Sequence, residues 1–147
     1  MRLNSLKLLP TLLLTFTVFF AFSQDEVKWS FSYNSDASCA LFSAELKDGW
    51  HLYSQFIDED LGPIPTTFDF LDNANLSRIE LVKESNVKTV YDENFGGDLG
   101  ILEGKAIFSQ QILVKESTIL KGTVLYMVCN DKGCLPPGVE EFEIEIN

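Results

Sequence analysis

Two of the three cysteines in this 147-residue chain lie close together near the C-terminus, in the segment "YMVCNDKGCLPP". Cys129 and Cys134 are separated by four residues, from Asn130 to Gly133, whose types are common in turns and on surfaces. A chain that doubles back over such a turn can bring two Cα atoms within the roughly 4.4–6.8 Å that a disulfide requires. Such a pair can act as a structural disulfide, as part of a metal site or as a redox couple.

The small size of this loop argues modestly against a purely structural disulfide. Closing so short a loop stabilises a fold by only about 2 kcal/mol, less than closing a longer one. Structural disulfides in β-sandwiches commonly connect strands that are distant in sequence. Short and exposed disulfides also tend to be the more reactive ones. Loop size therefore favours a reactive pair and leaves the structural alternative open.

A metal site is less well supported, because zinc takes four ligands that often come from two closely spaced pairs. The remaining candidates are Cys39 and the single histidine, His51, and both are far from the pair in sequence. We expect Cys39, on the opposite face of its strand from Phe42, to be a small buried apolar residue. We expect His51 to be a partly buried strand residue that is hydrogen-bonded to backbone. No metal and no cofactor is predicted.

A redox role requires a thiolate and an accessible sulfur atom. Asp131 lies between the two cysteines, and Glu140 and Glu141 follow shortly after them. Neighbouring carboxylates disfavour a thiolate, and Lys132 opposes them only in part. Such a pair is expected to react slowly with arbitrary thiols and faster with a docked partner. This behaviour is typical of a selective relay.

The N-terminal residues have the pattern of a secretion signal. Arg2 and Lys7 precede an apolar stretch over residues 8–22, and Ala21 and Ser23 fit the small-residue positions of a cleavage site. The stretch is shorter than the roughly 20 apolar residues of a membrane span, which disfavours an uncleaved anchor. The sequence therefore predicts a signal peptide and export to an oxidising compartment, where disulfides can form.

Removal of residues 1–23 as the signal peptide leaves a mature chain over residues 24–147, long enough for one domain with a real core. This chain has 9 basic and 22 acidic residues, and so a net charge of −13. A nucleic-acid partner is excluded on this ground, because the phosphate backbone would be repelled.

Alternating apolar residues recur along the mature chain and position the cysteine pair at the end of a strand. About eight short strands are expected, separated by turn residues, with no convincing helix. The expected strands are residues 27–33, 40–46, 51–55, 66–70, 78–82, 105–114, 123–129 and 141–146. Residues 83–100, which are polar and rich in glycine, are expected to form a long loop. The pattern predicts an all-β, antiparallel sandwich with a single core.

Three segments resemble the N-terminal periplasmic domain of the thiol:disulfide interchange protein DsbD family. They are "DGWHLYSQFI" (residues 48–57), "YDENFGG" (residues 91–97) and "YMVCNDKGCLPP" (residues 126–137). The resemblance implies an immunoglobulin-like sandwich whose cysteine pair cycles between dithiol and disulfide. The spacing of the two cysteines here is shorter than in the best-known members.

The resemblance also implies roles for individual residues. Cys134 matches the cysteine that forms mixed disulfides with partners, and Cys129 matches the resolving cysteine. Phe95 matches an aromatic residue in a cap loop that shields the pair, with Asp92 and Glu93 as the adjacent acids. A further aromatic position of the active-site surroundings is matched by Tyr53, for which ordinary packing is the alternative.

The partners implied are a membrane-embedded thiol reductase as electron donor and periplasmic thioredoxin-fold proteins as acceptors, including those of cytochrome c maturation. Because the sequence ends at Asn147, the donor is expected to be a separate protein. A protein-disulfide reductase activity is the expected enzymatic contribution. Two alternatives remain: a non-catalytic secreted binding module with a structural disulfide, and an accessory subunit of a membrane transporter without redox chemistry.

Overall fold

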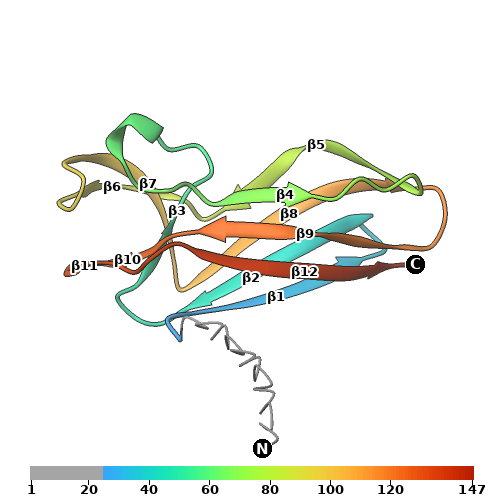
Figure 1. Cartoon of the computed structure of the whole chain (residues 1–147), viewed down its shortest axis with the longest axis horizontal. Helices are drawn as coiled ribbons and strands as arrows, with labels where there is room; N and C mark the ends of the chain where they lie inside the picture. The colour runs from blue at the N-terminus through green and yellow to red at the C-terminus, as the bar shows by residue number, and fades with distance from the viewer. Residues whose placement is uncertain (1–24) are drawn as a thin grey trace, which may run out of the picture.

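Two antiparallel sheets form the body of the domain, and their strands run along its long axis (Figure 1). The computed structural model describes residues 25–147, so the predicted signal peptide, residues 1–23, lies outside the described residues. One sheet has the order β1-β2-β8-β5, with bounds Val27–Asn34, Cys39–Leu46, Lys105–Val114 and Leu76–Ser85. The facing sheet has the order β12-β9-β4, with bounds Gly138–Ile146, Thr118–Tyr126 and Thr67–Phe70.

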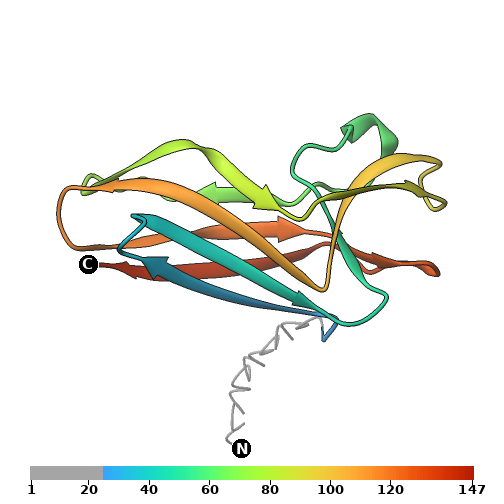
Figure 2. The ribbon, with the colours of Figure 1, turned by 180° about the vertical axis from the view of Figure 1, so that it is seen from behind.

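A third sheet lies at the end of the domain away from the C-terminus, as both views show (Figures 1 and 2). Its order is β11-β10-β3-β7-β6, with bounds Gly133–Cys134, Val128–Asn130, His51–Tyr53, Gly97–Glu103 and Lys88–Asp92. A short 3-10 helix, η1 (Glu59–Leu61), lies at the same end. Within residues 25–147 no helix is long and apolar enough to cross a membrane.

The core between the two main sheets is rich in aromatic side chains. Phe42 of β2 lies with its ring centroid 4.8 Å from that of Phe68 and 5.0 Å from that of Phe142, which come from the facing sheet. Burying a side chain of this size contributes on the order of 1.5–3 kcal/mol, and tilted or edge-to-face ring pairs add to this. The alternating apolar residues of the sequence thus unite the two sheets, as expected for a sandwich.

Two strands of the sandwich, β8 and β9, are each continuous along the chain with a strand of the end sheet. β7 leads into β8 through Gly104, which has a φ of +64° and accepts a hydrogen bond at its carbonyl from the Leu46 N–H, 2.7 Å away. A left-handed backbone conformation of this kind favours glycine. β9 leads into β10 through Met127. The cysteine hairpin is therefore an extension of strands anchored in the core.

All eight predicted strands are present, although the segment 123–129 is divided between β9 and β10. The prediction of a long loop over residues 83–100 was wrong, because β6 and most of β7 form a hairpin there. Only one face of this hairpin packs inward, through side chains such as Val90 and Leu99. In β6 the buried Asp92 is polar and the exposed Tyr91 is aromatic, and this weakens the alternation that reveals a strand.

β5 contains an irregularity that one buried polar side chain supports. Its register against β8 shifts between Ile79 and Lys83, and Glu80 has a φ of +63°. The Gln110 side chain, 2% exposed, donates from Nε2 to the Ile79 carbonyl at 2.9 Å and to the Glu80 carbonyl at 3.4 Å. Gln110 thereby satisfies backbone acceptors that the bulge removes from the ladder.

Gln110→Leu is expected to lower the free energy of unfolding by about 1–3 kcal/mol, because the Ile79 and Glu80 carbonyls of the bulge lose their buried side-chain donor. Urea unfolding followed by circular dichroism measures the change. Gln111→Leu is the comparison. The Gln111 side chain also donates to two carbonyls, those of Ala37 and Ser38, but they lie in an exposed turn, so its effect is expected to be smaller. Equal stability of Gln110→Leu and the wild type would show that the bulge does not depend on this side chain.

Candidate functional site

Cys129 and Cys134 lie opposite each other in the β10–β11 hairpin and form a disulfide, with Cα atoms 4.0 Å apart. The residues between them form a turn, as their types predict. The Asn130 side-chain oxygen Oδ1 accepts a hydrogen bond from the Lys132 N–H at 2.9 Å, and Gly133 has a positive φ of 139°. The four intervening residues thus form a tight turn that holds the two cysteines in register.

The two cysteines differ sharply in their exposure. Cys129 is 0% exposed and belongs to a small apolar cluster with Tyr53, Leu99 and Ile101. Cys134 is exposed at the edge of the end sheet. Thiol–disulfide exchange requires a thiolate to reach one of the two sulfur atoms. An incoming protein thiolate therefore has access from the side of Cys134.

A hydrogen-bonded group of three side chains lies beside the buried cysteine. The Tyr53 hydroxyl donates to Asp92 Oδ2 at 2.6 Å, and His51 Nε2 lies 3.2 Å from the same hydroxyl and 3.8 Å from Asp92 Oδ2. Burial raises the pKa of Tyr53, and the hydrogen bond to Asp92 raises it further. Burial also lowers the pKa of His51, against the opposing effects of Asp92, Glu103 and Asp131.

Tyr53→Phe is expected to lower the free energy of unfolding by about 1.5–3 kcal/mol, because the buried Asp92 carboxylate loses a strong donor. Urea denaturation of the oxidised protein measures this change. Tyr91→Phe is a matched control, because Tyr91 is 66% exposed, and it is expected to change little. A Tyr53→Phe midpoint equal to that of Tyr91→Phe would contradict the prediction.

The turn between β6 and β7, which we call the cap loop (residues 93–96), packs beside the cysteine hairpin. The Phe95 ring lies edge-on to Tyr53, with centroids 5.8 Å apart, and packs against the cluster that contains Cys129. Gly62 leaves room for this ring, since a Cβ atom there would lie 3.2 Å from it. The Asn94 side chain donates from Nδ2 to the Asn130 carbonyl at 3.4 Å.

The predicted acids of the cap loop have different environments. Asp92 ends β6, is 5% exposed, and accepts hydrogen bonds from Tyr53 and from the Asn94 N–H at 2.8 Å. It thus connects the cap loop to the group beside Cys129. Glu93 is exposed on the loop. The expectation that His51 is hydrogen-bonded to backbone was wrong, because its Nε2 atom contacts the Tyr53 hydroxyl instead.

Other candidate residues lie outside this group. Cys39 is a free, buried cysteine on β2, as expected. Glu140 and Glu141 pair with Val124 and Thr123 in the β9–β12 ladder and not with the hairpin. The acidic residues around the hairpin are therefore not those that follow it in sequence. His51 was missed as a site residue because its contact with Asp92 joins two strands distant along the chain.

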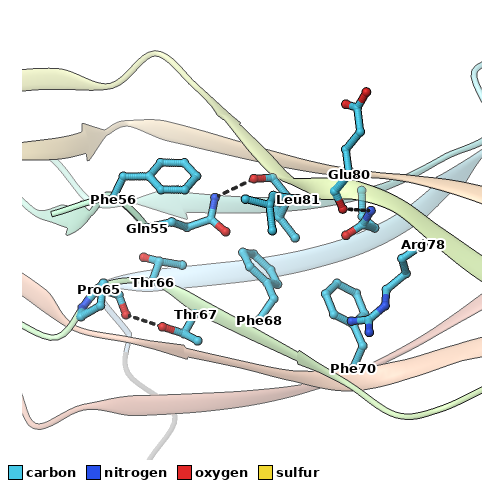
Figure 3. Close-up of a pocket in the computed structure, with 12 residues that line it drawn as sticks. Gln55, Phe56, Pro65, Thr66, Thr67, Phe68, Phe70, Arg78, Glu80 and Leu81 are labelled. Atoms are coloured by element: carbon cyan, nitrogen blue, oxygen red, sulfur yellow. Dashed lines mark hydrogen bonds between the residues drawn. The ribbon is translucent and has the colours of Figure 1, made fainter.

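A metal site and a groove elsewhere in the domain are the alternatives to a site at the cysteine hairpin. Within the part of the chain that the structure describes, no three His, Cys, Asp or Glu side chains form a group that could hold a metal ion. A groove opens between β4 and β5, lined by Phe68, Phe70, Arg78 and Leu81 among others (Figure 3). The Arg78 guanidinium lies 4.5 Å from the centroid of the Phe70 ring. Neither cysteine of the pair lines this groove.

Comparison with known proteins places the chain in one family. Residues 21–146 match the family described as "Thiol:disulfide interchange protein DsbD, N-terminal". The chain belongs to the DsbD N-terminal domain family. No match was found among curated proteins. The matched region includes the cysteine hairpin, the cap loop and β3, so the three segments that carried the resemblance in the sequence all belong to the family domain.

Three solved structures share this fold, and two of them contain a DsbD N-terminal domain. The reduced N-terminal domain of DsbD from Neisseria meningitidis has a TM-score of 0.62 and 18% identity, covering 83% of this chain and 86% of that chain. The complex of the Neisseria meningitidis DsbD and PilB N-terminal domains has a TM-score of 0.60 and 15% identity, covering 84% of this chain and 88% of that chain. The N-terminal periplasmic domain of ScsB from Proteus mirabilis has a TM-score of 0.55 and 13% identity, covering 87% of this chain and 49% of that chain. The immunoglobulin-like, all-β expectation is confirmed.

Proposed function

We propose that this protein is a periplasmic thiol–disulfide relay. The Cys129–Cys134 pair takes electrons from a membrane-embedded thiol reductase and passes them to thioredoxin-fold proteins, including those of cytochrome c maturation. The observation that carries this proposal is the asymmetric disulfide, with one cysteine exposed at the end of the domain and the other buried. The solved DsbD–PilB complex supports an interaction between a DsbD N-terminal domain and another protein domain.

The relay proceeds in two exchange steps. In the reduced protein, the Cys134 thiolate attacks a disulfide sulfur of the acceptor, forms a mixed disulfide and displaces one acceptor thiolate. Cys129 then attacks the Cys134 sulfur, which restores the intramolecular disulfide and releases the second acceptor thiolate. The pair thereby loses two electrons and the acceptor gains them. The donor reduces the Cys129–Cys134 disulfide again by the reverse sequence.

The cap loop restricts which thiols reach the pair. Phe95 packs against the cluster that contains Cys129, which supports a shielding role, and Asp92 fixes the start of the loop by accepting a hydrogen bond from the Asn94 N–H. Tyr53 supports the Phe95 ring, and the exposed Glu93 carboxylate faces an approaching partner on the loop surface. A docked partner displaces the loop before exchange, which is a gating step. Export through the predicted signal peptide, and the periplasmic domain of ScsB, support the location.

The reduction potential of the pair is expected to lie between about −120 and −270 mV, the range of exchange proteins, and not below about −300 mV, as for structural disulfides. Equilibration with glutathione or dithiothreitol buffers, followed by mass spectrometry of alkylated protein, measures it. Far-UV circular dichroism of the reduced form is the companion measurement. A potential below the exchange range together with unfolding on reduction would instead establish a binding module with a structural disulfide.

A further inference from the structure

The only histidine of the chain lies directly beside the buried cysteine. β3 runs between β10 and β7, so His51 faces Cys129 on one side and Glu103 on the other. Residues directly opposite in an antiparallel pair have Cβ atoms about 4.5–5.5 Å apart and project from the same face. The imidazole is thus a near neighbour of the Cys129 side chain. The His51 side chain is only 13% exposed.

The hydrogen bonds of this group determine which ring nitrogen of His51 can accept a proton. The Tyr53 hydroxyl gives its hydrogen to Asp92 Oδ2, so its oxygen accepts a hydrogen bond from His51 Nε2–H. The neutral ring therefore carries its proton on Nε2 and has its basic lone pair on Nδ1. Asp92 Oδ2, 3.8 Å from Nε2, is placed to stabilise the imidazolium that forms when Nδ1 is protonated.

Cys129 needs such a neighbour if it is the resolving cysteine. It is fully buried in an apolar cluster, and apolar surroundings disfavour the thiolate that attacks a disulfide. Cys129 itself has no exposed surface, so a side chain beside it is better placed than bulk water to take the proton. A base positioned beside the nucleophile solves this problem in other nucleophilic sites.

We propose that His51 is the proton acceptor for Cys129 in the resolving step, an inference that rests on the proposed relay function. As the proton moves from the Cys129 thiol to Nδ1 of His51, the sulfur lone pair forms a bond to the Cys134 sulfur. The bond between Cys134 and the acceptor breaks, and its electron pair leaves on the acceptor sulfur as a thiolate. When the disulfide is reduced by the donor, His51 returns the proton to Cys129.

The charges around His51 suit this role. Asp92 and Tyr53 face it from β6 and β3, Glu103 faces it from β7, and Asp131 acts on it from the hairpin turn. Glu103 is itself paired with Lys88, 2.7 Å away. Burial lowers the pKa of His51, so the ring is neutral and able to accept a proton at neutral pH. The nearby carboxylates then stabilise the imidazolium after transfer.

The reaction of the reduced protein with 5,5′-dithiobis(2-nitrobenzoate) separates the two steps without any protein partner. Attack by the exposed Cys134 releases the first nitrothiobenzoate in a fast phase. Displacement by Cys129 releases the second in a first-order phase. His51→Gln is expected to slow the second phase at least about tenfold near pH 7, since general bases contribute roughly 10²–10⁴-fold. The first phase is expected to stay within about twofold of wild type.

The pH profile distinguishes a proton acceptor from a structural residue. In the wild type the second phase is expected to slow as the pH falls through the pKa of His51, because the protonated ring cannot accept. In His51→Gln this inflection disappears, and the rate of the second phase instead rises continuously with pH as more of the Cys129 thiolate forms. Glu103→Gln is the control, which removes a neighbouring carboxylate but retains the imidazole and the inflection.

A second phase in His51→Gln that matches wild type at all pH values would overturn the proposal, as would an equal slowing of both phases. Circular dichroism of each variant establishes that the fold is retained. The readout is independent of the relay function. A wild-type protein that shows both phases and the His51 inflection, yet transfers no electrons to a thioredoxin-fold protein, would refute the relay and leave the proton transfer intact.

Discussion

Cys129→Ser is expected to accumulate a covalent complex between Cys134 and a thioredoxin-fold partner. The exposed Cys134 retains its access to the partner disulfide, whereas the residue that resolves the mixed disulfide is absent. Turnover therefore stops after the first exchange step. Incubation of the reduced variant with an oxidised thioredoxin-fold protein, followed by non-reducing electrophoresis and mass spectrometry, detects the complex. The linkage is expected to map to Cys134.

Cys134→Ser is expected to abolish disulfide transfer, to below about one thousandth of the wild-type rate, while the domain remains folded. The remaining thiol of the pair, Cys129, is fully buried and cannot meet a protein disulfide. Cys39→Ser is the matched control, because Cys39 is a buried free cysteine outside the hairpin, and transfer is expected to persist. Retained transfer in Cys134→Ser, or a mixed disulfide mapped to Cys129, would refute the assigned order of the two cysteines.

Phe95→Ala is expected to accelerate reduction of the disulfide by glutathione about tenfold. The ring packs against the cluster that buries Cys129 and against Tyr53, so its removal opens the covered side of the disulfide to small thiols. The same change is expected to reduce the preference for a protein partner over glutathione, because the barrier that the partner removes by docking is already absent. Stopped-flow fluorescence or timed alkylation measures both rates.

Phe56→Ala is the control for this prediction, because Phe56 is 66% exposed and does not pack against the Cys129 cluster. Its reaction with glutathione is expected to equal that of the wild type. If Phe95→Ala reacted no faster than Phe56→Ala, the cap loop would have no shielding function. Thermal unfolding of both variants establishes that increased reactivity does not come from loss of the fold.

The sequence predicts the strands of the sandwich and the cysteine hairpin because both are encoded locally. Alternating apolar residues in segments such as 105–114 match β8, and the turn residues between the cysteines match a tight hairpin. The β6–β7 hairpin was missed for the complementary reason. Its strands pack through one face at the end of the domain, so their apolar pattern is short and interrupted.

The environment of the site depends on contacts between strands that are far apart in sequence. Asp92 meets Tyr53 across 39 residues, and Asn94 meets Asn130 across 36. No spacing rule encodes such contacts, because they exist only when β3, β6, β7 and β10 assemble into one sheet.

The sequence alone determined that two cysteines share a turn, and family resemblance assigned them an order. Only the tertiary structure decided that Cys129 is buried beside His51 while Cys134 is exposed. The physical reason is that burial is the sum of contacts from several strands. Two cysteines of one local motif can therefore have opposite environments. β10, which carries Cys129, lies between β11 and β3, and Phe95 of the cap loop packs against its cluster, whereas β11, which carries Cys134, forms the edge of the sheet.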